Sequence, residues 1–163
     1  MIDAALAQRS AELGALLVAR GQRIAAAESC TGGLVAAAIT ATAGSSGWFD
    51  AGFVCYSNPV KVALLGVPES TLAAHGAVSE ATARAMAEGA CERAGADLAV
   101  AVTGIAGPGG AVPGKPVGTV CLAWAVRGGE TDALTRHFPG DRAQVRRLAT
   151  LAALDGAIER LRT

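Results

Sequence analysis

The sequence predicts an α/β protein, a three-layer α/β/α sandwich built on a mixed sheet. Two observations lead to this fold class. Short apolar runs that suit buried strands alternate with segments of helical periodicity along the first part of the chain. Two later apolar runs flank a glycine-containing turn, as in a β-hairpin. Such an order favours a sheet with helices on both faces.

The first unit comprises a helix, a strand, a tight turn and a second helix. Leucines return on one face of residues 4–20, and Gly21 is a typical helix end. Residues 23–28 are short and apolar enough for a buried strand. Residues 29–33 form a turn of small side chains, and residues 34–41 are helical in pattern. A glycine-containing turn therefore lies between a strand and a helix.

The middle of the chain contains a second strand and three helices. We predict the strand over residues 51–56, and Pro59 breaks it because proline lacks the N–H that a sheet requires. Short helices are predicted over residues 59–65 and 69–74. A longer helix over residues 79–93 begins with a serine, which is a favourable N-terminal cap.

A third strand, a long loop, a hairpin and a final helix complete the expected fold. The strand covers residues 97–103, and the glycine- and proline-rich residues 104–115 form the loop. Strands over residues 116–126 and 131–138 form the hairpin. Asp141 caps the last helix. The buried stripe of that helix is expected to contain Val145, Leu148, Leu151, Ile158 and Leu161.

Composition predicts one domain over residues 1–163 and a core of small side chains. A chain of 163 residues has the length of a single domain, and 52% hydrophobic residues is too apolar for disorder. Alanine supplies much of this content, and aromatic residues supply only 4%, so we expect closely packed helices. The formal net charge of zero argues against a nucleic-acid surface, which usually needs a basic excess.

Targeting and metal-binding patterns are not found in the sequence. No apolar run approaches the ~20 residues of a membrane span. The N-terminus lacks the basic start and apolar stretch of a signal peptide, so we expect no membrane partner and a cytoplasmic location. The four cysteines form no C-x-x-C pair, and the two histidines lack ligand spacing. We therefore expect free thiols, no metal and no cofactor.

The turn at residues 29–33 is the first candidate for chemistry. Ser29 lies where backbone N–H groups and the positive end of a helix face a bound group. Its hydroxyl could attack a carbonyl carbon while those amides stabilise the oxyanion. Alternatively, Ser29 simply caps the helix. Cys30 is a rival nucleophile, because a helix N-terminus lowers a thiol pKa, although a small buried cysteine is the more usual interpretation.

A serine nucleophile needs a base, and Lys61 is the candidate because neither histidine lies in a glycine-rich motif. A lysine accepts a proton only where burial or nearby positive charge lowers its pKa. A serine–lysine pair is a known variant of the catalytic triad. Tyr56, the only tyrosine, could orient or relay the proton. The local alternatives are a surface lysine and a strand-end tyrosine.

A second glycine-rich segment follows the third predicted strand. Exposed amides in such a loop can hold a phosphate or an oxyanion. The segment is neither a Walker A loop nor a G-x-G-x-x-G fingerprint, and an ordinary long connection is the alternative. Both glycine clusters follow strands, so they can face one crevice at the carboxyl ends of the sheet. Arg142 could contact an anionic substrate there, or supply solvated or subunit-interface charge.

Five motifs occur in a fixed order along the chain. They are AESCTGG at 27–33, Tyr56-Ser57-Asn58 with Lys61, TGIAGPGG at 103–110, KPVGTV at 115–120, and Phe138 with Gly140-Asp141-Arg142. Taken together, the motifs resemble the CinA C-terminal domain family, whose standalone members include the PncC-type nicotinamide-nucleotide amidases. The resemblance runs from the first helix to the last and rests on the joint order and spacing of the motifs. One departure is Pro59-Val60, where many relatives carry Glu-Ala.

The resemblance implies a mixed, mostly parallel five-stranded sheet and the deamidation of nicotinamide mononucleotide to nicotinate mononucleotide and ammonia, in pyridine-nucleotide salvage. The family's serine, tyrosine and lysine fall on Ser29, Tyr56 and Lys61. The alternatives are a catalytically silent nucleotide-binding module and a competence- or DNA-repair-associated module.

We expect a homo-oligomer that binds this small-molecule nucleotide and no nucleic acid. The Trp48-Phe49 pair could pack against a second subunit or within the core. Substrate contacts are expected at Glu28, Cys30, Thr31, Gly32, Gly33, Asn58, Thr103, Gly104, Ala106, Gly107, Pro108, Gly110 and Arg142.

Overall fold

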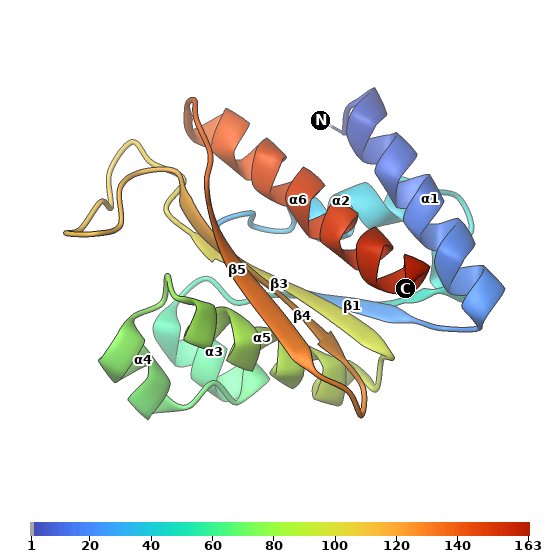
Figure 1. Ribbon diagram of the computed structural model, residues 1–163, viewed down its shortest axis with the longest axis horizontal. Helices are drawn as coiled ribbons and strands as arrows, with labels where there is room; N and C mark the ends of the chain where they lie inside the picture. The colour runs from blue at the N-terminus through green and yellow to red at the C-terminus, as the bar shows by residue number, and fades with distance from the viewer. Residues whose placement is uncertain (1) are drawn as a thin grey trace.

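The computed structural model describes residues 2–163 and has the predicted three-layer α/β/α architecture (Figure 1). Within these residues one five-stranded sheet has the order β2-β1-β3-β4-β5. β1 pairs in parallel with β2 and β3, whereas β4 is antiparallel to β3 and β5. In this sheet β4 alone runs opposite to its companions, which confirms the mixed, mostly parallel sheet. The strands are β1 (Ile24–Glu28), β2 (Phe49–Val54), β3 (Leu98–Gly104), β4 (Thr119–Val126) and β5 (Thr131–His137).

Helices cover both faces of the sheet (Figure 1). One layer contains α1 (Ala4–Arg20), α2 (Leu34–Thr40) and α6 (Arg142–Arg162). The other layer contains α3 (Asn58–Leu65), α4 (Glu69–His75) and α5 (Glu80–Ala94). None of the helices in residues 2–163 combines the length and the apolar character that a membrane crossing requires.

The boundaries of β2 and β4 differ from the prediction by two or three residues, and those of the other strands by one at most. β2 covers residues 49–54 rather than 51–56, because the chain turns after it into α3, whose N-terminal cap is Ser57. β4 begins at Thr119 rather than at position 116. Pro116 has no N–H for the ladder, and Gly118 has a φ of 94°, which only glycine adopts readily. The residues before Thr119 therefore belong to the loop.

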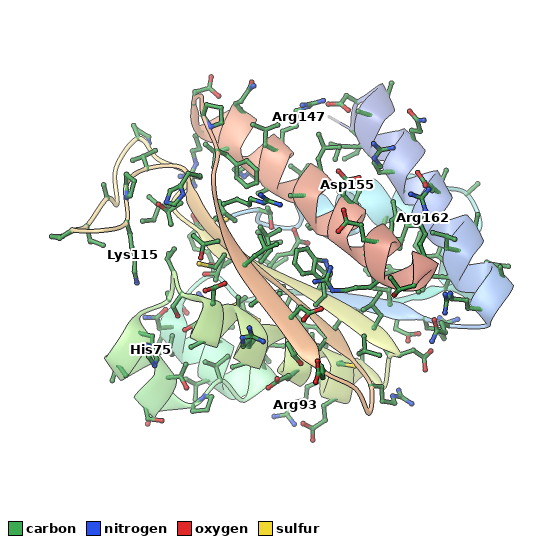
Figure 2. The ribbon with its side chains drawn as sticks, in the orientation of Figure 1. His75, Arg93, Lys115, Arg147, Asp155 and Arg162 are labelled. Carbon is green, nitrogen blue, oxygen red and sulfur yellow. The ribbon has the colours of Figure 1, made fainter. Side chains whose placement is uncertain are left out.

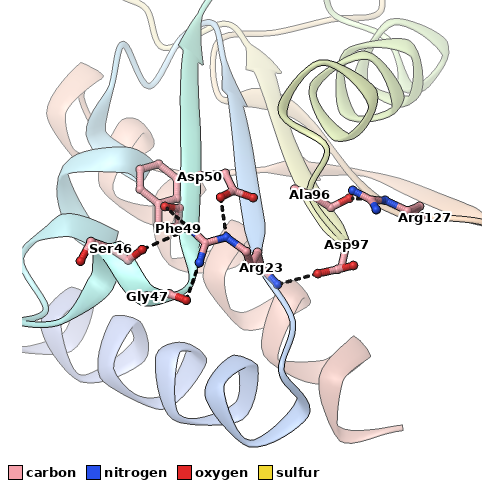
Figure 3. Close-up of polar contacts among 8 residues, drawn as sticks. All are labelled: Arg23, Ser46, Gly47, Phe49, Asp50, Ala96, Asp97 and Arg127. Atoms are coloured by element: carbon pink, nitrogen blue, oxygen red, sulfur yellow. Dashed lines mark hydrogen bonds and ion pairs between the residues drawn. The ribbon is translucent and has the colours of Figure 1, made fainter.

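Arg23 explains the early start of β2 (Figure 3). Its guanidinium donates to three carbonyl groups within residues 46–49 and pairs with Asp50. Its backbone N–H donates to the carboxylate of Asp97, at 2.8 Å. These contacts join the N-terminal ends of β1, β2 and β3, so this end of the sheet is fixed by polar contacts.

The core consists mainly of small aliphatic side chains, as predicted. The three alanines of β1 are completely buried between two apolar clusters, one on each face of the sheet. Trp48 packs within the cluster beneath α1, where a Cβ on Gly14 would lie 2.6 Å from its ring. Trp48 therefore belongs to the core and gives no support to a subunit contact. The homo-oligomer stays a prediction.

The buried stripe of α6 contains smaller side chains than expected. Leu148 and Leu151 are only half-buried, and that part of the prediction is wrong. Small residues take their place because α6 lies close to the sheet over Trp124, whose Nε1 donates to the Ala153 carbonyl at 3.0 Å. Gly156 faces the same indole ring, and a Cβ there would collide with it. The fully buried residues of the stripe include Val145, Ala149, Thr150, Ala153, Leu154 and Ala157.

We predict that Gly156→Ala destabilises the protein by about 1–3 kcal/mol, because the added methyl group overpacks the contact with Trp124. This loss exceeds the gain of about 1 kcal/mol that alanine brings to a helix interior. Gly47→Ala is the matched control, since no atom lies within 4 Å of a Cβ at that position. Urea unfolding would contradict the packing argument if both variants were as stable as wild type.

Candidate active site

A cavity of about 250 Å³ lies at the edge of the sheet where β1, β2 and β3 end. Ser29 follows β1, Tyr56 follows β2, and Gly104 ends β3, so three parallel strands bring their carboxyl ends together. β5 runs in the same direction, and α6 therefore begins at this edge with Arg142. The predicted residues that line the cavity are Ser29, Cys30, Tyr56, Asn58, Lys61, Thr103, Gly104, Ala106, Gly107, Gly110 and Arg142.

The lining also contains residues that the sequence did not indicate. Ala77 and Val78 enter from the segment between α4 and α5, and Ile105 and Gly109 belong to the loop after β3. The hydroxyl of Thr103 donates to the Ala77 carbonyl at 2.8 Å, which fixes that segment against β3. The residues predicted to contact substrate that do not line the cavity are Glu28, Thr31, Gly32, Gly33 and Pro108.

Glu28 serves the fold rather than the cavity. Its carboxylate is completely buried and accepts hydrogen bonds from the N–H groups of Val35 and Ala36, at 2.8 and 3.1 Å. These amides belong to the first turn of α2, so Glu28 caps the helix and neutralises its positive end. Two expectations are corrected here. Ser29 is not the cap, and the start of α2 is not available to a substrate.

The turn that carries Ser29 is held by backbone hydrogen bonds. The N–H of Ser29 donates to Val102 of β3 at 2.9 Å, and its carbonyl accepts from Gly32 at 3.0 Å. The sequence suggested that the amides of this turn stabilise an oxyanion. The N–H of Gly32 cannot do so in this conformation, because it already donates to Ser29. The side chain of Thr31 is buried, and its hydroxyl has no hydrogen-bond partner among the described residues. Ser29 lines the cavity, and its hydroxyl makes no hydrogen bond within residues 2–163.

Lys61 is buried in the cavity wall, so the surface alternative is wrong. Its side chain is 1% exposed, and its Nζ donates to the carbonyl of Tyr56 at 2.9 Å. No carboxylate among the described residues pairs with it. Burial lowers the pKa of Lys61 below its ordinary value, and the thiols of Cys55 and Cys30 oppose this shift. Pro59, which departs from the family pattern, lies in the first turn of α3.

Cys30 is a poor rival nucleophile. Burial, and to a smaller extent the Glu28 carboxylate, raise the pKa of its thiol to about 11, despite the opposing effect of Arg146 and Arg142. The expectation that a helix end would lower this pKa is corrected, since Glu28 occupies that helix end. A thiol with such a pKa contains little thiolate near neutral pH. Ser29 is the better candidate.

Tyr56 and Arg142 meet beside the cavity. The Tyr56 side chain is 59% exposed, and its hydroxyl accepts a hydrogen bond from Nη2 of Arg142 at 3.0 Å. Nη1 of the same guanidinium donates to the Gly107 carbonyl at 2.8 Å. Arg142 thus joins the second glycine-rich loop to Tyr56, so its charge faces the cavity in the described chain.

Both histidines lie outside the cavity. His75 and His137 line a neighbouring cavity of about 420 Å³, where Nζ of Lys115 donates to the His75 carbonyl at 2.8 Å (Figure 2). Among residues 2–163 no group of three side chains is arranged to hold a metal ion. Lys61 is therefore the basic side chain that shares a cavity with Ser29 and can exist in the neutral form.

Arg146 was overlooked as a site residue, although it follows Arg142 by one helical turn. Its Nε donates to the carbonyl of Cys30 at 3.1 Å, and its Nη2 donates to the carbonyl of Thr31 at 3.0 Å. A serine in the cavity wall, a lysine whose pKa burial lowers and a fixed turn of backbone amides are parts that acyl transfer can use.

Comparisons with known proteins identify the family of the chain. The family model described as CinA C-terminal domain matches residues 6–161. A protein from Escherichia coli K12 named nicotinamide-nucleotide amidohydrolase PncC is 53% identical, over 94% of this chain and 93% of its own. A putative competence-damage inducible protein from Symbiobacterium thermophilum is 58% identical over 87% of this chain, which spans about a third (35%) of that relative.

A solved structure has the same fold over the whole chain. The competence/damage inducible protein CihA from Agrobacterium tumefaciens superposes with a TM-score of 0.95 and 41% sequence identity, covering 100% of this chain and 99% of its own. Its likeness confirms the α/β fold class that the sequence predicts.

We predict that Lys61→Met alters the pH dependence of stability. Wild type gains stability as pH rises from the lowered pKa of Lys61 to its ordinary value of 10.5, because the unfolded chain there binds a proton that the folded chain releases. Below that window both states are protonated, and the cost of burying the charge is present in full. The variant lacks this cost.

The measurement is urea unfolding of both proteins from about pH 7 to about pH 10. The free energy of unfolding of the variant minus that of wild type should fall as pH rises. A difference that stays constant, or that grows with pH, would show that Lys61 is not destabilised by its charge.

Proposed function

Because the chain belongs to the CinA C-terminal domain family, we propose that it is an amidohydrolase that converts nicotinamide mononucleotide into nicotinate mononucleotide and ammonia. The name of the Escherichia coli relative supports this substrate. The observation that carries the proposal is that Ser29 shares its cavity with a buried lysine that pairs with no carboxylate within residues 2–163. We place the reaction in cytoplasmic pyridine-nucleotide salvage.

In the proposed mechanism, the hydroxyl oxygen of Ser29 attacks the carboxamide carbon while the neutral amine of Lys61 takes the hydroxyl proton. The tetrahedral intermediate then breaks its C–N bond as the ammonium of Lys61 gives its proton to the leaving nitrogen, which departs as ammonia. The neutral amine of Lys61 next takes a proton from water, whose oxygen attacks the ester carbon. When the bond to Ser29 breaks, the ammonium returns this proton to the serine oxygen, and the acid product loses its own proton to solvent to give the carboxylate. The backbone carbonyl of Tyr56 accepts a hydrogen bond from Nζ of Lys61 and so positions the lysine side chain.

The oxyanion donor in this proposal is the backbone amide of Cys30, a residue that lines the cavity. Among the described residues this N–H contacts only its own sulfur. The amide of Thr31 also lacks an acceptor in the described chain, but Thr31 is completely buried and does not line the cavity. A preorganised amide stabilises charge that develops in the transition state. Arg142 and the amides of the glycine-rich loop are placed beside the cavity to bind the anionic phosphate of the nucleotide.

We expect Ser29→Ala and Lys61→Ala each to reduce ammonia release from nicotinamide mononucleotide by at least ~10³-fold, as loss of a nucleophile or its base does in related hydrolases. Cys30→Ala should retain turnover within ~10-fold, because its thiol is protonated. Ammonia release at the wild-type rate by Ser29→Ala would exclude Ser29 as the nucleophile. Tight binding without turnover by wild type would favour the silent nucleotide-binding module.

The pH dependence of kcat/KM provides a separate test of the base. Lysine accepts a proton only in its neutral form, so kcat/KM should rise with pH through the lowered pKa of Lys61, with a midpoint below 10.5. A stopped assay of ammonia release across pH measures this limb. A rising limb near pH ~4 would instead indicate a carboxylate base.

A further inference from the structure

Arg146 contacts the turn of Ser29 from a distant part of the sequence. It lies on α6, and its two hydrogen bonds reach the consecutive carbonyl groups of Cys30 and Thr31, at 3.1 and 3.0 Å. The guanidinium is half-buried and does not line the cavity. Its planar fork suits two neighbouring acceptors better than a lysine ammonium would.

These two contacts determine the direction of backbone N–H groups. The peptide bonds of the turn are trans, since the one cis bond in residues 2–163 is Gly107-Pro108. In a planar trans peptide the N–H points opposite to the preceding carbonyl. When Arg146 binds the carbonyl of Cys30, it therefore turns the N–H of Thr31 away from the guanidinium.

The second contact acts on Cys30 through a relay. Arg146 binds the carbonyl of Thr31, which sets the N–H of Gly32, and this N–H donates to the carbonyl of Ser29 at 3.0 Å. The carbonyl of Ser29 shares its peptide plane with the N–H of Cys30. Three consecutive peptide planes after Ser29 are thus held by one side chain.

We propose that Arg146 is a positioning residue that, through the carbonyl groups of Cys30 and Thr31, aims the amide of Cys30 at the oxyanion of the reaction. This inference rests on the proposed function. Arg146 acts through the backbone and not by touching substrate. Its loss should therefore weaken binding of the transition state more than binding of the substrate.

The neighbouring arginine supplies a matched control. Arg147, labelled in Figure 2, lies on the same helix but pairs with Asp3, the N-terminal cap of α1. Both side chains are arginines near the start of α6 and both are half-buried. Replacing either removes one charge and the polar contacts of one guanidinium, but only Arg146 contacts the turn.

The kinetic test compares Arg146→Met, Arg146→Lys and Arg147→Met with wild type. Outright loss of one oxyanion donor slows an enzyme ~10²–10³-fold, so a misdirected Cys30 amide in Arg146→Met should lower kcat at least ~10-fold. KM should change less than ~3-fold. Arg146→Lys keeps the charge without the fork and should be intermediate, whereas Arg147→Met should stay within ~2-fold of wild type.

Amide hydrogen exchange provides a readout that does not depend on the substrate. In Arg146→Met the peptide covering residues 29–34 should exchange faster than in wild type and Arg147→Met, because the Gly32 hydrogen bond loses its support. Circular dichroism at the assay temperature verifies that each variant is folded. If Arg146→Met does not fold, Arg146→Lys takes its place under the same criteria.

Faster exchange together with a lower kcat supports the inference. Unchanged exchange in residues 29–34 of Arg146→Met would overturn it. If wild type is active, a kcat of Arg146→Met equal to that of wild type would overturn it as well. If wild type releases no ammonia but the variant exchanges faster, the positioning of the turn stands and the proposed substrate is wrong.

Discussion

The buried carboxylate of Glu28 is the interaction on which the active-site turn depends. A charge that is completely removed from water is costly unless hydrogen bonds replace its hydration. The N–H groups of Val35 and Ala36 supply these bonds from the first turn of α2. Because Glu28 caps the helix from the end of β1, the intervening turn needs no capping side chain, and the hydroxyl of Ser29 remains free to face the cavity.

The same arrangement keeps the charge of Glu28 away from Lys61. Had the carboxylate paired with the amine, the attraction would have raised the pKa of Lys61 and held it protonated. Instead the acidic groups that act on Lys61 are the thiols of Cys55 and Cys30, and burial outweighs them. A buried lysine can then lose its proton, which is the condition for a base. The fold thus gives the two buried ionisable groups different partners. Glu28 binds the amides of α2, and Lys61 binds the carbonyl of Tyr56 in the cavity wall.

Much of the fold and part of the site could be predicted from local sequence. Sequence patterns located the five strands and the six α-helices of the described residues but not the 3-10 helix Ser45–Gly47. The order of motifs identified Ser29, Tyr56 and Lys61, which share one cavity. The role of Glu28 could not be predicted, because a strand-end glutamate next to a glycine turn is equally suited to a substrate. Its partners depend on how α2 packs. Arg146 was missed for the same reason, since its acceptors lie 115 and 116 residues away.

The small side chains of the core connect composition to this site. An arginine on α6 reaches the carbonyl groups of the Ser29 turn only if the helix lies close to the sheet. Gly156 and the buried alanines of α6 permit that approach over Trp124, and the cation of Arg160 stacks on the same ring at 4.1 Å. Larger residues at these positions would move the helix outward, and with it both Arg142 and Arg146. The alanine-rich composition is therefore a requirement of the active-site geometry as well as of the core.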